Sequence, residues 1–340
     1  VNALFEDSKG SIWMSVWDGG VYRHDPNASA SFTFFNTDKG LSVNKIKSIS
    51  EDREGNILLG TFGAGLAVYK GEKFISYSKK NGLINNQVWT IAQDRKGKFW
   101  FGTNEGISVF NPKEVNAYKA FENYDNIGGL ISNSVRAIKE DKDGNLWIGT
   151  WGGKVAMFDV FKNKFITLPS LSENVSNHIS CIEIDKKGRV WFGSLQGISL
   201  YSPETGETRV IRTLDGLSEN DITCIFADSK GNVWIGTKQR GITKYDGNKF
   251  TKLGKENGLL HSSITCITEG KRGTIWIGTE GGGVYSYDEK VFLNYKTKDG
   301  LVSDFITLMT VDKKNNLWIG TNKGLNRFDY SKNIFFTYGK

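Results

Sequence analysis

The sequence contains a repeated unit. At a few positions of this unit, some copies have aromatic or basic side chains where the other copies have small or polar residues. Trp17, Phe62 and Trp151 each follow a short apolar segment, and Trp89 and Arg136 stand near the start of another. An indole face beside a cation is the composition of a site for a saccharide or for a ligand that is partly apolar and partly anionic. The alternative interpretation is that these rings only pack against one another. The candidate ligand-binding residues are Trp17, Lys47, Phe62, Trp89, Arg136, Trp151 and Arg240.

Residues that perform acid–base or metal chemistry do not group in this sequence. The only histidines are His24, His178 and His261, and none lies in a metal-binding spacing. The three cysteines form no C-x-x-C pair, and we expect them to be small buried side chains. The glycine run at 280–284 has no helix after it, so it lacks the context of a phosphate-binding loop. The sequence therefore predicts no catalytic residue, no metal site and no cofactor.

The composition excludes several classes of protein. Of 340 residues, 38% are hydrophobic and 13% aromatic, so the chain can bury a core and is not disordered. The net charge is +7, but the lysines sit in short turns and no basic stripe follows any element, so we expect no nucleic-acid partner. No run of about 18 apolar residues is present, so we expect no direct membrane insertion. Val1 is neither Met nor part of a signal peptide, which indicates a processed chain or a segment of a longer one.

A phrase of the form apolar-Trp-apolar-Gly-Thr organises the chain. It returns eight times at intervals of 42 to 47 residues, the length of one four-stranded propeller blade. An Asp six residues before the central position of most copies indicates a repeated turn. We interpret Asn44, Asn86, Asn133, Asn177 and Asn220 as caps of their own loops. The central positions of the phrase are Trp13, Leu58, Trp100, Trp147, Trp191, Trp234, Trp276 and Trp318.

Each unit divides into four short strand-like runs separated by Gly, Asn or Asp, which predicts an all-β protein. A four-stranded blade has two apolar faces that only neighbouring blades can bury, so we expect a single β-propeller domain of antiparallel blades over residues 1–340. Eight blades are favoured over seven blades plus an extra unit, because an unpaired blade would expose apolar surface. The expected units are 1–44, 45–86, 87–133, 134–177, 178–220, 221–262, 263–304 and 305–340.

The candidate residues occupy two kinds of loop. In meandering propellers, the loop that enters the innermost strand and the loop between the second and third strands lie on the same face. Trp17, Phe62, Trp89, Arg136 and Trp151 all fall in the first four units. We therefore expect them to gather on one half of that face.

The repeat has a recognisable pattern, which reads V-x-x-I-x-x-D-x-x-G-N-x-W-I-G-T, followed by G-G, by Y/F-D, by F-x-x-Y and by G-L-x-x-N. It is clearest at 135–153, 222–250 and 264–288. It resembles the two-component regulator propeller repeat, and the resemblance covers essentially the whole chain. Departures are local, since Leu58 replaces the Trp of the second unit and Gly270 replaces the Asp of the seventh.

The resemblance implies a function. Propellers of this family are extracytoplasmic ligand-sensing parts of bacterial membrane-bound regulators, often hybrid histidine kinases that respond to oligosaccharides. It implies a periplasmic or extracellular location, a small-molecule ligand such as an oligosaccharide, and a downstream signalling domain in the same natural chain. Two alternatives stay open. One is a propeller lyase of the streptogramin-lyase type, with His178 or His261 as the base, and the other is a propeller that docks proteins.

Overall fold

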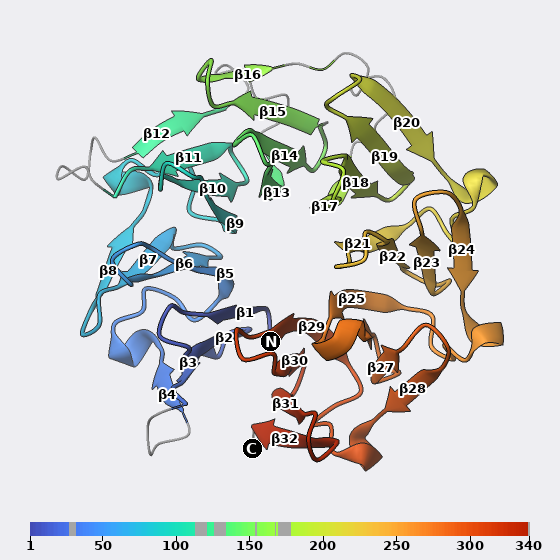
Figure 1. Cartoon of the computed structure of the whole chain (residues 1–340). Coiled ribbons are helices and arrows are strands. Elements are labelled where there is room, and N and C mark those ends of the chain that lie inside the picture. The colour runs from blue at the N-terminus through green and yellow to red at the C-terminus, as the bar shows by residue number, and fades with distance from the viewer. Residues whose placement is uncertain are drawn as a thin grey trace. The chain divides into compact units, whose positions relative to one another are not determined.

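The computed structural model describes residues 1–26, 32–112, 121–125, 134–153, 155–166, 168 and 178–338. Within these ranges the chain forms 32 β-strands and six one-turn 3-10 helices, and no α-helix. The strands pair as eight antiparallel sheets of four strands in chain order (Figure 1). The protein is an all-β, eight-bladed β-propeller, which confirms the fold predicted from the repeat.

The blades fall into two compact units of four blades each. The first unit comprises Asn2–Glu173 and Asn177–Ile179, and it contains blades 1 to 4. Its strands are β1 (Ala3–Glu6), β2 (Ile12–Val16), β3 (Gly20–His24), β4 (Thr33–Phe35), β5 (Ile46–Glu51), β6 (Ile57–Thr61), β7 (Leu66–Tyr69), β8 (Phe74–Tyr77), β9 (Val88–Gln93), β10 (Phe99–Thr103), β11 (Ile107–Phe110), β12 (Phe121–Tyr124), β13 (Val135–Glu140), β14 (Leu146–Thr150), β15 (Val155–Asp159) and β16 (Lys164–Ile166). Its 3-10 helices are η1 (Thr37–Lys39) and η2 (Lys79–Asn81).

The second unit comprises Val1 and Ser180–Lys340, and it contains blades 5 to 8. Its strands are β17 (Ile179–Ile184), which starts at the boundary, β18 (Val190–Ser194), β19 (Gly197–Ser202), β20 (Glu207–Ile211), β21 (Ile222–Ala227), β22 (Val233–Thr237), β23 (Ile242–Tyr245), β24 (Phe250–Leu253), β25 (Ile264–Glu269), β26 (Ile275–Thr279), β27 (Val284–Tyr287), β28 (Phe292–Tyr295), β29 (Ile306–Val311), β30 (Leu317–Thr321), β31 (Leu325–Asp329) and β32 (Ile334–Tyr338). Its 3-10 helices are η3 (Thr213–Asp215), η4 (Lys255–Asn257), η5 (Lys271–Gly273) and η6 (Thr297–Asp299).

The second strand of each blade carries the framework Trp, and its position is fixed by a buried Asp. In six blades the indole Nε1 donates to the carboxylate of the Asp six residues earlier, over 2.8 to 3.0 Å. The same carboxylate accepts backbone N–H groups of the turn that it opens, as Asp228 does from Lys230 and Asn232. The repeated Asp therefore forms the turn, as predicted, and it also holds the core Trp. In blade 2, which has Leu58, the Asn56 amide donates to Asp52 over 2.7 Å instead.

Blade 7 lacks this Asp, because residue 270 is glycine. The hydroxyl of Tyr330, from blade 8, takes the space and accepts the backbone N–H of Lys271 over 3.3 Å. Its ring packs edge-on against Trp276 with centroids 6.2 Å apart. A Cβ at Gly270 would lie 2.3 Å from the Tyr330 hydroxyl oxygen and 2.6 Å from Trp276 Nε1. The Tyr330 hydroxyl therefore occupies the space of the missing carboxylate, while the buried Nε1 of Trp276 has no hydrogen-bond partner among the described residues.

The asparagine before the innermost strand forms hydrogen bonds within its own loop and to the preceding blade. The side-chain oxygens of Asn44, Asn86 and Asn220 accept the N–H of the residue seven positions earlier, which begins a 3-10 helix. Their backbone carbonyls accept N–H groups of glycines in the preceding blade, as Asn86 does from Gly65 over 2.9 Å. The predicted capping role is confirmed at these three positions, while Asn133 and Asn177 lie outside the described residues. At these three positions, the contact also brings the loop after the second strand against the next blade.

The cysteines pack close to glycines of the adjacent strand. A Cβ on Gly193, Gly236 or Gly278 would lie 2.6 Å from the Sγ of Cys181, Cys224 or Cys266. Burial raises the pKa of Cys181 to about 11 and that of Cys266 to about 12. Such thiols stay protonated and unreactive near neutral pH, which agrees with their predicted role as small packed side chains.

Candidate ligand-binding site

Six of the seven candidate residues lie at one edge of the first unit. Trp17, Phe62 and Trp151 directly follow β2, β6 and β14, and the other three are the second residues of β5, β9 and β13. Phe62 bridges to Gln87 at the entry of β9 in the next blade. The backbone N–H of Trp151 donates to the carbonyl of Ser134, just before β13, over 2.7 Å. Loops that follow second strands and the starts of innermost strands therefore meet, as predicted.

Three of the rings form a row across blades 1, 2 and 3. The ring centroids of Trp17 and Phe62 are 5.7 Å apart and tilted by 54°. Those of Phe62 and Trp89 are 5.3 Å apart and nearly perpendicular, at 73°. Edge-to-face packing of this kind stabilises aromatic clusters. The rings are therefore held in fixed positions by one another.

Two cations cover the faces of these rings. The Nζ of Lys47 lies 4.4 Å from the ring centre of Trp17 and 5.3 Å from that of Trp89. The guanidinium carbon of Arg136 lies 3.5 Å from the ring centre of Trp89 and 5.8 Å from that of Trp151. Both cations are within the range of a cation–π interaction. We call Trp17, Lys47, Phe62, Trp89, Arg136 and Trp151 the aromatic–cation cluster.

Within the described ranges, no acidic side chain pairs with the cations of the cluster. Among the described residues, neither Lys47 nor Arg136 makes an ion pair, and the buried Nε of Arg136 has no hydrogen-bond partner. Burial, and after it the charge of Arg136, lowers the pKa of Lys47, and burial lowers the pKa of Arg136. Two half-buried like charges without a counter-ion among the described residues are electrostatically unfavourable.

Trp89 is anchored by polar residues that the candidate set does not contain. Its Nε1 donates to the side-chain oxygen of Asn104 over 2.7 Å, and the hydroxyl of Ser134 donates to the same oxygen over 3.4 Å. The Asn104 amide donates in turn to Gln87. The signal in the sequence was the place of Asn104, which follows β10 as Trp17 follows β2. Lys45, whose Nζ lies 5.7 Å from the ring centre of Trp17, was also missed.

The cluster is open to solvent at both ends. Trp17 is 45% exposed and Trp151 is 44% exposed, whereas Phe62 and Trp89 are half-buried. Packing among the rings therefore explains the middle of the row and leaves the indoles of Trp17 and Trp151 partly accessible. The seventh candidate, Arg240, is an exposed residue of the β22–β23 turn in the second unit. Its backbone N–H donates to the hydroxyl oxygen of Thr237 over 3.2 Å.

The histidines do not assemble a metal centre. His178 packs edge-on against Trp151, with centroids 4.7 Å apart, and so borders the cluster. His24 packs against Phe32 in blade 1. Among the residues that the structure describes, no group of three or more His, Cys, Asp or Glu side chains is arranged to hold a metal ion.

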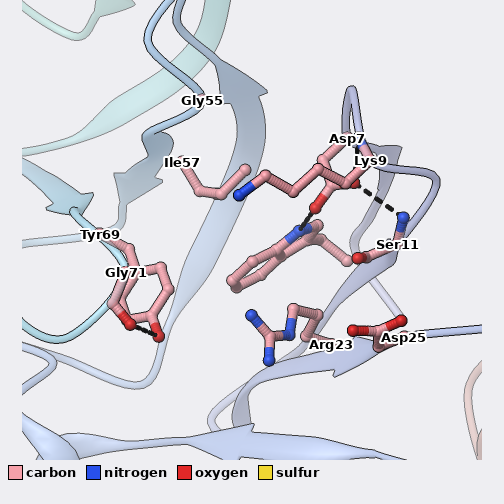
Figure 2. A pocket seen from close by; sticks show the side chains of 10 residues that line it. Asp7, Lys9, Ser11, Arg23, Asp25, Gly55, Ile57, Tyr69 and Gly71 are labelled. Atoms are coloured by element: carbon pink, nitrogen blue, oxygen red, sulfur yellow. Dashed lines mark hydrogen bonds between the residues drawn. The ribbon is translucent and has the colours of Figure 1, made fainter. Parts of the chain in front are cut away.

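A separate cavity of about 290 Å³ lies between blades 1 and 2 (Figure 2). It sits at the end of β2 that begins with Ile12, whereas Trp17 follows the other end. Lys9, Arg23 and Tyr69 contribute side chains to its wall. The cavity is therefore distinct from the aromatic–cation cluster.

The repeat defines the class of the protein as a propeller built from copies of one sequence unit, and a family model identifies the unit. Seven stretches match the model described as two component regulator propeller, at residues 40–63, 82–105, 129–152, 175–196, 216–239, 258–281 and 300–323. The chain belongs to this family, which confirms the resemblance noted in the sequence.

Solved structures share the fold. The chain is similar to the extracellular domain of the putative hybrid two component system BT4673 from B. thetaiotaomicron, with 23% identity over 100% of this chain and 54% of that chain and a TM-score of 0.57. It is also similar to virginiamycin B lyase from Staphylococcus aureus, with 18% identity over 74% of this chain and 83% of that chain and a TM-score of 0.55. The computationally designed Ika8 protein is similar as well, with 16% identity over 100% of this chain and 96% of that chain and a TM-score of 0.68. At these identities the likeness shows the fold alone.

The chain spans about half the length of the BT4673 domain. No curated protein matches it. Within the described ranges, no helix is long and apolar enough to cross a membrane.

Proposed function

We propose that this propeller is the ligand-binding input module of a bacterial two-component type regulator, located in the periplasm or outside the cell. Its ligand is an oligosaccharide or a similar small polar molecule, bound on the aromatic–cation cluster. Membership of the two-component regulator propeller family supports the sensor role. The observation that carries the site is the pair of unpaired cations, Lys47 and Arg136, between two half-exposed indoles.

The cluster has the chemistry for such a ligand. The exposed parts of the Trp17 and Trp151 indoles suit the C–H faces of a sugar ring. A carboxylate or a hydroxyl group of the ligand would accept hydrogen bonds from the ammonium group of Lys47 and from the guanidinium group of Arg136. Because Lys47 and Arg136 stand on the innermost strands of blades 2 and 4, a bound anion would relieve their repulsion and link these strands. A downstream signalling domain in the natural chain would read that change.

Binding is tested with a panel of neutral and acidic oligosaccharides, followed by tryptophan fluorescence and thermal shift. The test variant replaces Trp17, Trp89 and Trp151 by Ala. The matched control is Phe161→Ala, because Phe161 is an aromatic residue of the same unit that is 84% exposed and lies outside the cluster. We expect at least one ligand to bind the wild type and the control, and to lose binding in the triple variant.

Three outcomes would contradict the proposal. If the triple variant binds like the wild type, the site lies elsewhere. If no saccharide of the panel raises the melting temperature, the ligand class is wrong. If a streptogramin B antibiotic is consumed in the presence of magnesium, and His178→Ala abolishes this turnover, the protein is a lyase and the sensor assignment fails.

A further inference from the structure

Two cations and an aromatic pair line the cavity shown in Figure 2. Lys9 comes from the β1–β2 turn, and Arg23 comes from β3, where it pairs across the ladder with Trp13. The guanidinium carbon of Arg23 lies 5.7 Å from the ring centre of Trp13. Tyr69 and Gly71 face them from blade 2. Among the described residues, the buried Nε of Arg23 has no hydrogen-bond partner, which points to a missing acceptor.

The corresponding place between blades 6 and 7 contains an acceptor. Lys230 comes from the β21–β22 turn, and Lys244 comes from β23, where it pairs across the ladder with Trp234. Both ammonium groups pair with the carboxylate of Glu289, at 2.9 and 3.6 Å. The site between blades 6 and 7 is therefore a carboxylate clamp made of two cations beside a framework Trp.

The two interfaces correspond in position and in contacts. In both, one basic residue stands four positions before the framework Trp and another stands ten positions after it. In both, a tyrosine of the next blade packs on that Trp, with centroids 5.6 Å apart for Trp13 and Tyr69 and 5.9 Å apart for Trp234 and Tyr287. A serine of the first turn is also bound by a glutamate of the next blade in each case. These pairs are Ser8 with Glu51 and Ser229 with Glu269.

The interfaces differ at the turn after the third strand of the second blade. Glu289 and Gly71 occupy the same place there, two residues after the tyrosine, and both have left-handed backbone, with φ of 73° and 83°. This conformation favours glycine, so a glutamate at position 289 has a cost in backbone conformational energy. Its carboxylate pairs with two lysines. Blade 2 has Gly71 at this place, so Lys9 and Arg23 of blade 1 lack an equivalent carboxylate. The cavity of about 290 Å³ lies where that carboxylate would be.

The acidic residues that line the cavity are compatible with an incoming carboxylate. Asp7 and Asp25 line it, and the equivalent residues of blade 6 are Asp228 and Asp246. The carboxylate of Glu289 pairs with Lys230 and Lys244 although Asp228 and Asp246 are present in blade 6. The charge of Asp7 is already compensated by N–H donors, including Trp13 Nε1 at 2.9 Å.

We propose that the cavity between blades 1 and 2 is a second ligand site, which binds the carboxylate group of a small organic acid where blade 7 supplies Glu289. Arg23 and Lys9 hold the carboxylate, because a guanidinium presents paired donors to two oxygens. Trp13, Tyr69 and Ile57 contact the apolar body of the acid. The cavity is at the small end of known ligand pockets, which fits an acid of roughly ten non-hydrogen atoms. This site is independent of the aromatic–cation cluster, which lies beyond the other end of β2.

The test uses benzoate as the probe and benzyl alcohol as its uncharged analogue, measured by calorimetric titration of the full chain. An Arg136→Gln background removes the guanidinium group of the aromatic–cation cluster. We expect saturable binding of one benzoate and no binding of benzyl alcohol. Arg23→Gln should weaken benzoate binding at least 10-fold, since the charged donor is lost. Lys244→Gln, the matched change in blade 6, should leave the affinity unchanged.

Two exchanges between the interfaces make the test sharper. Gly71→Glu supplies the missing carboxylate from within the chain, so it should abolish benzoate binding while the melting temperature stays near that of the background protein. Glu289→Gly opens the equivalent clamp, so it should raise the stoichiometry from one benzoate to two. The proposal is overturned if Gly71→Glu binds benzoate as before, or if Glu289→Gly adds no site. Equal binding of inorganic phosphate, with the same dependence on Arg23, would also overturn the assignment to carboxylates.

Discussion

The two cations of the aromatic–cation cluster should repel each other measurably in the ligand-free protein. Lys47 Nζ and Arg136 Cζ lie 5.3 and 3.5 Å from the ring centre of Trp89, so the charges are no more than about 9 Å apart. At that distance two like charges repel by about 0.5 kcal/mol in bulk water and by about 2 kcal/mol at an effective dielectric constant of 20. We therefore expect a repulsive coupling of about 0.5–2 kcal/mol.

The coupling is measured with a double-mutant cycle of Lys47→Met, Arg136→Met and the double variant, using urea unfolding at low salt. Methionine keeps an apolar stem and removes the charge. Either single substitution relieves the same repulsion, so the double variant should be less stable than the two single effects predict, by the coupling energy. In 1 M salt the coupling should fall towards zero, because the screening length drops to about 3 Å.

The matched control is a cycle between Lys47 and Arg53, because Arg53 lies in the turn that follows the other end of β5. That cycle should give no coupling.

The pH dependence supplies an independent check. The folded-state pKa of Lys47 is lowered, so the unfolded state binds more protons and stability should rise with pH in the window that ends near the ordinary value of 10.5. Lys47→Met should remove this rise. An attractive or absent coupling at low salt would refute the argument that both cations face one anion site.

Two further predictions concern the framework. Burial alone would raise the pKa of Asp228, but hydrogen bonds from Trp234 and the turn outweigh it and lower the pKa. Asp228→Asn should therefore cost about 1–3 kcal/mol at pH 7, and the difference from wild type should shrink as the pH falls below the unfolded-state value of about 3.9, measured by urea unfolding. Gly270→Asp should destabilise by about 1–3 kcal/mol, because its Cβ would meet Tyr330 and Trp276. Adding Tyr330→Ala should recover stability, and an additive double variant would contradict the proposed replacement.

Much of the fold was predictable because most units of the repeat carry the same framework residues. The framework Trp, the turn Asp and the capping Asn recur at fixed spacing, so each unit predicts the next. The hydrogen bond between the Asp and the indole was not predicted, because spacing alone does not show that a turn carboxylate faces inward. Tyr330 was not predictable either, since it acts across a blade interface on a residue 60 positions earlier.

The membership of the aromatic–cation cluster was also readable from the sequence, since each member breaks the repeat at a position known to share one face. The contacts were not readable. The approach of Arg136 to Trp89, and the anchoring of Trp89 by Asn104, depend on side-chain directions across three blades. The cavity between blades 1 and 2 was missed because Gly71 is an ordinary turn residue. Only the comparison with Glu289 in the folded repeat shows what the glycine leaves out.

Departures from the repeat differ in whether the structure compensates for them. Gly270 lacks the framework carboxylate, and the Tyr330 hydroxyl occupies its space and accepts the backbone N–H of Lys271. The buried Nε1 of Trp276 has no hydrogen-bond partner among the described residues, so the compensation is partial. Lys47 and Arg136 add charge without a counter-ion, and Gly71 removes a counter-ion that another interface provides. A substitution that leaves buried polar groups unpaired lowers the free energy of unfolding. Such destabilising features are typical of ligand-binding sites. Uncompensated departures are therefore a guide to candidate sites in a repeat protein, and from among them we propose the aromatic–cation cluster and the cavity beside Trp13 as ligand sites.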